Sequence, residues 1–175
     1  TRNKNNSKTC VDQESKNDNA FAALKDDGSV VTWGLDRWGG DSSEVSDSLT
    51  SVSQIYSTGG AFAALKDDGS VVTWGGEDRG GDSSNVRDDL TSGVSQIYSN
   101  YWAFAAVKDD GSVVTWGYDT RGGDSSDVRD DLTSGVSKIY SNNLGGSFAA
   151  LKDDGSVVTW GVNEYGGDSS DVRDD

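Results

Sequence analysis

The sequence predicts an all-β protein made of four copies of one unit, because one string of residues returns at a nearly constant interval. The string AFAALKDDGSVVTWG occupies residues 20–34 and 61–75, and it returns with one substitution at 103–117 and at 147–161. The tryptophans near the ends of the four copies are 41, 42 and 44 residues apart. The length differences fall between the conserved blocks, as expected for a stack of equivalent units joined by variable loops.

Two further blocks accompany the main string. GGDSS follows each tryptophan after a spacer of constant length, and a block of the type LTSGVSQIYS begins at residues 49, 90 and 132. We therefore divide the chain into an irregular leader, residues 1–19, and four repeats, at about 20–60, 61–102, 103–146 and an incomplete 147–175. Residues 11–13 occupy the place of residues 94–96 relative to the next phenylalanine. The leader is thus expected to supply a strand that completes the last repeat.

Each main string has the pattern of a β-hairpin. Residues 62–65 and 71–74 are short strand-forming runs, and Asp67-Asp68-Gly69 lies between them. This triplet suits a three-residue loop, which is a type I turn followed by glycine in the left-handed conformation. Residues 94–99 are expected to form a third strand, with Val94 and Ile97 as its apolar anchors.

The segment between the hairpin and the next strand has a different pattern. In residues 124–132, Asp124 is placed to cap a helix, and Asp127 three residues later completes a pair that resembles a capping box. Val128 and Leu132 are four residues apart and would share one helical face. A helix of one or two turns and an irregular segment pinned by these two residues both fit this pattern.

One such unit has too little apolar area to fold alone, so its neighbours must bury it. Two architectures provide this burial, a closed propeller of about 4–8 blades and an open solenoid. In either, the aromatic residues of the strands are expected to form the core. They are Trp33, Trp74, Trp116 and Trp160 together with Phe21, Phe62, Phe104 and Phe148.

Composition and charge exclude several functions. The formal net charge of −15 argues against a nucleic-acid partner, because phosphate binding needs a basic surface. Direct docking on an anionic membrane is disfavoured for the same reason, and no apolar run approaches the roughly 18 residues that span a bilayer. The one cysteine, Cys10, provides neither a disulfide framework nor a metal cluster.

Catalytic and metal signals are weak as well. The chain contains no histidine, which removes the Ser-His-Asp and Cys-His pairs, and we expect no enzymatic activity and no cofactor. The Asp-Asp-Gly turns resemble parts of calcium loops, yet the complete calcium-loop spacing is missing. We therefore interpret them as hairpin turns and keep calcium as a minor alternative.

The wording ALKDDGSVVTWG resembles the core of the RCC1-like repeat, and the resemblance extends over residues 20–175. The repeat length is similar to that of the short-repeat branch, which includes a bacterial β-lactamase inhibitor protein. The wording is also similar to predicted proteins of marine microalgae. The resemblance implies a β-propeller whose four blades form a closed ring or part of a larger propeller, and an open solenoid is the alternative. It further implies that the loop faces bind proteins.

The sequence departs from this family in two places. The family has a histidine before the Ala-Leu strand, and its Gly-Gln-Leu-Gly motif stands where this chain has GGDSS. We therefore expect neither the exchange-factor function nor the chromatin function of the founding member.

Candidate recognition residues are those that vary between otherwise copied repeats. Exposed Trp, Tyr and Arg dominate protein interfaces. The last residue of the spacer is one variable set, and the loop before each phenylalanine is the other. The candidates are Trp38, Arg79, Arg121 and Tyr165 from the spacers and Tyr101, Trp102 and Leu144 from the loops. The competing interpretation is that these are drifted loop residues packed on the next repeat.

These observations predict a non-catalytic structural or protein-interaction module that is a segment or subunit of a larger assembly. A soluble binding protein or inhibitor that grips one protein partner through the variable aromatic loops is an alternative. A calcium-dependent surface adhesion protein is another. The expected partners are other proteins, and an extracellular or organelle-lumenal location is favoured over the cytoplasm.

Overall fold

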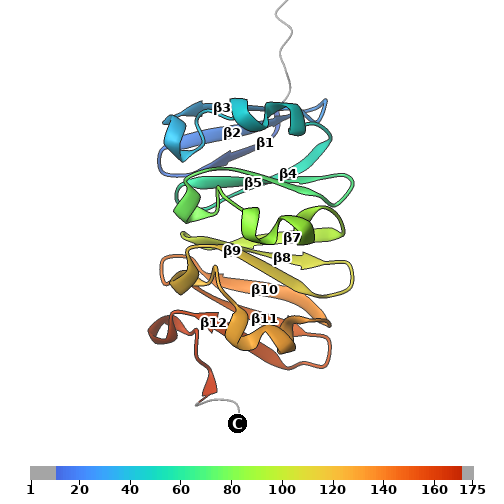
Figure 1. The fold of residues 1–175 in the computed structure, drawn as a ribbon, viewed down its shortest axis with the longest axis vertical. Coiled ribbons are helices and arrows are strands. Elements are labelled where there is room, and N and C mark those ends of the chain that lie inside the picture. Colours follow the sequence, from blue (N-terminus) through green and yellow to red (C-terminus); the bar gives the residue numbers. More distant parts are fainter. Residues whose placement is uncertain (1–10, 171–175) are drawn as a thin grey trace, which may run out of the picture.

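The computed structural model describes residues 11–170, which form four three-stranded antiparallel sheets. The sheets follow one another along the longest axis of the molecule in the order of the sequence (Figure 1). Each sheet is made of three consecutive strands in sequence order. We call the four sheets blades 1 to 4.

Blade 1 contains β1 (Val11–Lys16), β2 (Ala20–Lys25) and β3 (Val30–Gly34). Blade 2 contains β4 (Val52–Ser57), β5 (Ala61–Lys66) and β6 (Val71–Gly75). Blade 3 contains β7 (Val94–Ser99), β8 (Ala103–Lys108) and β9 (Val113–Gly117), and blade 4 contains β10 (Val136–Asn142), β11 (Ser147–Lys152) and β12 (Val157–Gly161). The connecting 3-10 helices are η1 (Asp36–Trp38), η2 (Ser43–Ser48), η3 (Glu77–Arg79), η4 (Ser84–Leu90), η5 (Asp119–Arg121), η6 (Ser126–Leu132) and η7 (Asn163–Tyr165).

The predicted hairpins are confirmed, and the turn has the expected chemistry. In blade 2, Lys66 N donates to Ser70 O at 2.9 Å and Gly69 has a φ of 75°, the left-handed conformation that glycine tolerates best. The Asp68 carboxylate closes the loop because it accepts hydrogen bonds from Ser70 N at 2.9 Å and from Ser70 Oγ at 2.6 Å. These bonds favour the charged form and lower the pKa of Asp68, first through the Ser70 hydroxyl and then through its backbone N–H.

The leader plays a different part from the expected one. Its strand β1 pairs antiparallel with β2 and completes blade 1, and blade 4 consists of β10, β11 and β12. In every blade, the outer edge of the hairpin's first strand can accept a further strand. The segment that directly precedes the hairpin in the sequence pairs there, because only a short connection is needed. The expectation that the leader completes the last repeat is corrected accordingly, since the strand before each hairpin belongs to the same blade as that hairpin.

The crossover between blades is a 3-10 helix that is pinned by two apolar residues. In η6, Leu132 is buried and Val128 packs beside the same core, as the spacing of these two residues indicated. The helix bends at Val128, whose φ of −120° is not helical. Asp124 does not cap it in the expected way: its carboxylate accepts from Ser126 N at 2.9 Å in a local turn, and no capping box forms with Asp127.

The core lies between the blades, not within them. One face of β2 presents Ala20, Ala22 and Leu24, and these residues pack on the opposite face of blade 2, which presents Ile55, Phe62, Ala64 and Trp74. The same arrangement joins blade 2 to blade 3 and blade 3 to blade 4. The small alanines of one blade therefore make room for the Phe and Trp of the next, and three equivalent junctions hold the four blades together.

The first glycine of each GGDSS block explains how closely the blades approach. A Cβ added to Gly80 would lie 2.7 Å from Cδ2 of Phe104 in the next blade, and Gly39 meets Phe62 in the same way at 2.6 Å. Both glycines also have φ near 93°, a conformation that residues with a side chain rarely adopt. The carbonyl of each glycine then accepts a hydrogen bond from the next blade's tryptophan, as in Trp116 Nε1 to Gly80 O at 3.1 Å.

The row of blades is open, so the core prediction holds only for blades with a neighbour on the correct side. Phe62 and Trp74 are 0% and 5% exposed, whereas Phe21 and Trp33 of blade 1 are 41% and 46% exposed. No other blade among residues 11–170 covers this face, which corrects the expectation that Phe21 and Trp33 lie in the core. Blades 1 and 4 lie at opposite ends of the molecule (Figure 1), and the four blades do not close on themselves. Within residues 11–170, no helix is both long and apolar enough to cross a membrane.

Candidate protein-binding surface

Five of the seven candidate recognition residues meet at one end of the strands. This end carries the loops that precede β5, β8 and β11 and the short helices that follow β3, β6 and β9. We call these five residues the arginine–aromatic surface. It comprises Trp38, Arg79, Tyr101, Trp102 and Arg121.

Arg79 lies at the centre of this surface. Its guanidinium carbon lies over the ring of Trp102, 4.0 Å from the ring centroid, and it is 5.1 Å from the ring centroid of Tyr101 and 5.7 Å from that of Trp38. A planar guanidinium over an aromatic face is attracted by the negative charge of the ring face. One cation from the helix after blade 2 therefore joins side chains from blades 1 and 3.

Trp102 extends the surface towards blade 4. Arg121 lies over its ring at 4.9 Å from the centroid, and Tyr101 packs against it edge-on at 5.0 Å. Tyr118, whose ring lies 5.9 Å from that of Trp102, belongs to the same group and was missed from the sequence. So was Arg37, which lies over Trp38 at 5.1 Å. Both occupy spacer positions that vary between the repeats, and this was the signal that could have identified them.

Local structure brings these residues together because the loops of successive blades are joined. Gly59 N donates to Tyr101 O at 2.8 Å, and Tyr101 N donates to Asn143 O at 2.8 Å. Glycines then provide flat places for the rings: a Cβ on Gly60 would lie 2.3 Å from Trp38, and one on Gly59 would lie 2.4 Å from Tyr101. The aromatic residues thus pack across blade junctions while they remain partly exposed.

Two nitrogen donors in this surface have no partner among the described residues. Arg79 Nε and Trp102 Nε1 are buried and make no hydrogen bond. Asp78 Oδ2 lies 3.7 Å from Arg79 Nε, close enough for an ion pair but too far for a hydrogen bond. Buried donors are normally satisfied, and these two are exceptions within the described residues.

Tyr101 connects the surface to blade 1. Its hydroxyl donates to Asp18 Oδ2 at 2.6 Å, across a sequence separation of 83 residues. This bond to a negative carboxylate raises the pKa of Tyr101, and partial desolvation raises it further, while the nearby Arg79 opposes both effects. The phenol is therefore held in its neutral, donating form.

The remaining two candidates lie apart from this group. Tyr165 is 51% exposed and Leu144 is 74% exposed, both at the open end of blade 4. Tyr165 occupies the same position in its repeat as Trp38, but within residues 11–170 no following blade packs against it. Its main-chain carbonyl accepts from Ser147 Oγ at 2.6 Å, which fixes η7 against its own blade.

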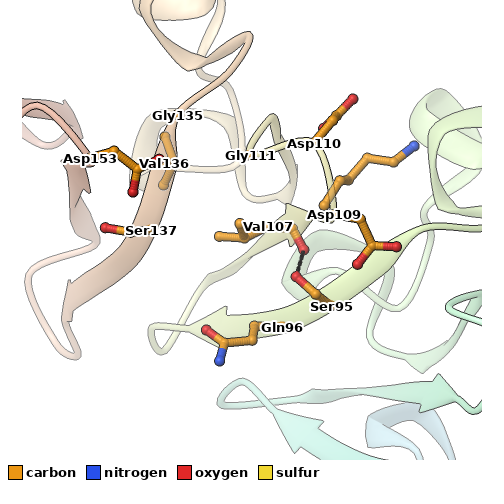
Figure 2. A pocket seen from close by; sticks show the side chains of 11 residues that line it. Ser95, Gln96, Val107, Asp109, Asp110, Gly111, Gly135, Val136, Ser137 and Asp153 are labelled. Carbon is orange, nitrogen blue, oxygen red and sulfur yellow. Dashed lines mark hydrogen bonds between the residues drawn. The ribbon is translucent and has the colours of Figure 1, made fainter.

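The opposite end of the strands is acidic and hollowed between the hairpin turns. A groove of about 430 Å³ lies between blades 3 and 4. It is lined by Ser95, Asp109 and Asp110 from one blade and by Ser137 and Asp153 from the other (Figure 2). The carboxylate of Asp110 is already bonded to Ser112 N and Oγ. Across residues 11–170, no three acidic, histidine or cysteine side chains come close enough together to hold a metal ion.

Comparison with known proteins identifies solved structures with a similar fold. No protein-family model matches the chain, and the search of curated proteins found no relative. Among solved structures, the chain is similar to human WBSCR16 (TM-score 0.57, 20% identity, 87% of this chain and 48% of that chain). It is also similar to Prp20p from Saccharomyces cerevisiae (TM-score 0.58, 17% identity, 89% and 46%), which is the yeast RCC1.

A third similar structure is the ectodomain of the Physcomitrella patens receptor kinase CR4 (TM-score 0.54, 14% identity, 87% and 42%). The chain thus has the fold of an RCC1-like β-propeller, and it spans about half the length of the solved structures that it matches. The β-propeller fold that the repeated sequence motif implied is confirmed.

Proposed function

We propose that the chain is a non-catalytic protein-interaction module that binds a protein partner through the arginine–aromatic surface. The observation that carries this proposal is the partly exposed group of Arg, Trp and Tyr side chains from successive blades, with Arg79 placed over the rings of Trp102, Tyr101 and Trp38. Interfaces are enriched in these residue types, and their strongest contacts combine a large aromatic area with a few fixed polar groups.

The chemistry of the surface describes the partner. Three arginines, Arg37, Arg79 and Arg121, gather here on a chain whose net charge is −15. A partner segment with a carboxylate or a main-chain carbonyl would accept hydrogen bonds from the guanidinium groups of these arginines, and an apolar neighbour on that segment would cover the rings. Recognition of an acidic or backbone acceptor by arginine is strong when it is shielded from water.

Solved structures of the same fold support protein binding as the general role. The Prp20p structure was described together with its binding to Gsp1p and histones, and yeast RCC1 was solved in a complex with Kap60. Both concern those proteins, and the partner proposed for this chain follows from its own surface. We further propose that the chain acts as a segment of a larger assembly, because its end faces are uncovered.

The test is capture of partners by three purified forms of the chain, followed by quantitative mass spectrometry of the bound proteins. The first form is the wild type, and the second carries Arg79→Gln together with Arg121→Gln. The third carries Arg129→Gln, which changes an exposed arginine on the crossover helix η6. We expect partners that the wild type and the control retain to drop at least about tenfold with the double variant, since charge-assisted bonds contribute about 1.5–3 kcal/mol.

Thermal unfolding followed by circular dichroism would show that the double variant is folded. Equal capture by all three folded forms would contradict a partner site at the arginine–aromatic surface.

A further inference from the structure

The two ends of the row of blades are complementary halves of one junction. At every junction within the chain, a glycine turn and the alanine face of one blade cover the Phe–Trp face of the next. Blade 1 leaves the Phe–Trp face open, with Phe21 stacked on Trp33 at 5.2 Å. Blade 4 leaves the opposite face open, and a Cβ on its glycine, Gly166, would have no atom within 4 Å.

Each junction contains one characteristic hydrogen bond, and among the described residues its donor and acceptor groups are found unpaired at opposite ends of the row of blades. Trp74, Trp116 and Trp160 each donate from Nε1 to the glycine carbonyl of the preceding blade at 3.1 Å. Within the described part of the chain, Trp33 Nε1 has no acceptor and Gly166 O has no donor. One end thus presents the donor of a fourth such bond, and the other end presents its acceptor.

An apolar contact follows the same register. Trp38 packs on the residue after the β6 strand, since a Cβ on Gly76 would lie 2.6 Å from its ring. Tyr165 is the equivalent of Trp38, and Leu35 is the equivalent of Gly76. Leu35 and Tyr165 are both about half-exposed, and the junction register would place the tyrosine ring against the leucine.

Two charged residues give the most specific evidence that the two ends fit each other. At the junction between blades 1 and 2, Gln13 bonds to the main chain of Ile55, with Nε2 donating to Ile55 O at 2.7 Å and Oε1 accepting from Ile55 N at 2.9 Å. In blades 2 and 3 the equivalent glutamine instead accepts from the hydroxyl of the tyrosine two residues later. The position of Gln13 recurs as glutamine in blades 2 and 3 but is Lys138 in blade 4. The position of Ile55 recurs as isoleucine in blades 3 and 4 but is Glu14 in blade 1.

The repeats therefore depart from their own pattern at the two positions that would meet, and they depart with opposite charges. Glu14 is exposed and forms no ion pair with another described residue, and Lys138 is exposed and lies over the ring of Tyr140. Opposite charges at matching places favour the correct partner and register over other contacts.

We propose that a second copy of this chain docks head to tail, so that blade 4 of each copy covers blade 1 of the other. Two copies of four blades then close into a ring of eight blades. A head-to-tail contact closes into a ring when the rotation per copy allows it, and rings of about 4–8 blades are the known range for propellers. The chain also covers about half the length of two solved structures of the same fold. This inference names one partner within the proposed assembly, and it does not use the arginine–aromatic surface.

The experiment is sizing chromatography with light scattering over a range of concentrations, together with acrylamide quenching of tryptophan fluorescence. We expect a mass of twice 18.5 kDa. Glu14→Lys alone and Lys138→Glu alone should each weaken the dimer by about tenfold or more per junction, because each places like charges together at both junctions. Quenching of Trp33 should rise as the dimer dissociates.

Mixing the two single variants provides the decisive measurement. In a mixed dimer, one junction regains the Lys138–Glu14 pair and the other gains the reversed pair, so the dimer should return. Asp47→Lys is the control, since it makes the same change in charge at an exposed residue of η2 away from both end faces. It should leave the dimer intact.

A monomer at every concentration, or open-ended filaments, would overturn the proposal. So would a dimer that is unchanged by both single variants. Arg79→Gln with Arg121→Gln should leave the dimer intact, so a failure of the ring and a failure of the partner surface give different results.

Discussion

Blade 1 and blade 2 contain the same fifteen-residue hairpin sequence, yet their aromatic pairs lie in opposite environments. Phe62 and Trp74 are buried against blade 1, while Phe21 and Trp33 face solvent. The stacking within each pair is nearly the same, with ring centroids 5.3 and 5.2 Å apart. The hairpin is therefore determined by its own sequence, whereas burial is determined by the neighbour, as expected for a linear array with nearest-neighbour contacts.

The largest effect should come from removing the same ring in the two environments. We expect Phe104→Ala to lower the free energy of unfolding by about 3–5 kcal/mol, because it leaves a cavity in the junction between blades 2 and 3. Phe21→Ala should cost about 1 kcal/mol or less, since it removes one exposed stacking contact. Urea unfolding in the Glu14→Lys background, which keeps copies apart, would measure both. Equal losses would show that the junction does not carry the stability.

A comparison of two equivalent glycines can distinguish the cost of backbone strain from the cost of a steric overlap with the next blade. Gly80 and Gly166 have φ of 93° and 92°, but only Gly80 faces a phenylalanine of a following blade. Gly166→Ala should cost about 1–2 kcal/mol from strain alone. Gly80→Ala should cost about 1–3 kcal/mol more, because its Cβ would overlap Phe104. Thermal unfolding in the same Glu14→Lys background would give the difference, and no difference would mean that the junction relaxes at little cost.

The smallest effect concerns the hydrogen bonds between aspartate and serine in the hairpin turns, which form within one repeat and involve no neighbouring blade. The pKa of Asp27 and the pKa of Asp68 are both lowered, first by the hydroxyl of the serine two residues later and then by its N–H. NMR titration should therefore give them similar pKa values in an end blade and in an interior blade. Ser29→Ala and Ser70→Ala should each raise the pKa of the partner aspartate towards its ordinary value. Different responses would show that the neighbouring blade enters the turn.

The same shifts fix the direction of the pH dependence. Because folding lowers these pKa values, the turns contribute stability above the ordinary aspartate pKa of 3.8 and lose it as the pH falls through the lowered values. The equivalent turns at Asp110 and Asp154 shift in the same direction for the same reasons. Denaturation midpoints measured between pH 5 and pH 2 should fall less in Ser29→Ala and Ser70→Ala chains than in the wild type.

The local features were predictable from the sequence because their causes are local. The Asp-Asp-Gly turn, the strand at residues 94–99 and the pinning of the crossover by Val128 and Leu132 depend on residues a few positions apart. The 3-10 form of the crossover was less accessible, because the Asp124 carboxylate bonds to a nearer N–H than a helix cap would. The pairing of β1 was misjudged because the match of residues 11–13 to residues 94–96 was taken to place the strand with the last repeat, whereas each such strand pairs with the hairpin that follows it.

Features that depend on neighbouring blades were only partly predictable. Tyr101 and Trp102 were selected because they vary, but their contact with Arg79 depends on the stagger between one blade's spacer and the next blade's loop. Tyr165 satisfies the same sequence rule and lies apart, because no blade follows it within the described residues. Exposure of Phe21 and Trp33 has the same origin, since identical sequence cannot reveal which copy stands at an end.

The contact between Gly80 and Phe104 also has a consequence for how such a gene can change. The two partners belong to different repeats, so a substitution at either one is accepted only if the adjacent repeat accommodates it. Unequal exchange between copies, in contrast, adds or removes a whole repeat and recreates the same contact at the new boundary. Each glycine is thus tied to the phenylalanine of the next repeat, and not to a partner in its own repeat.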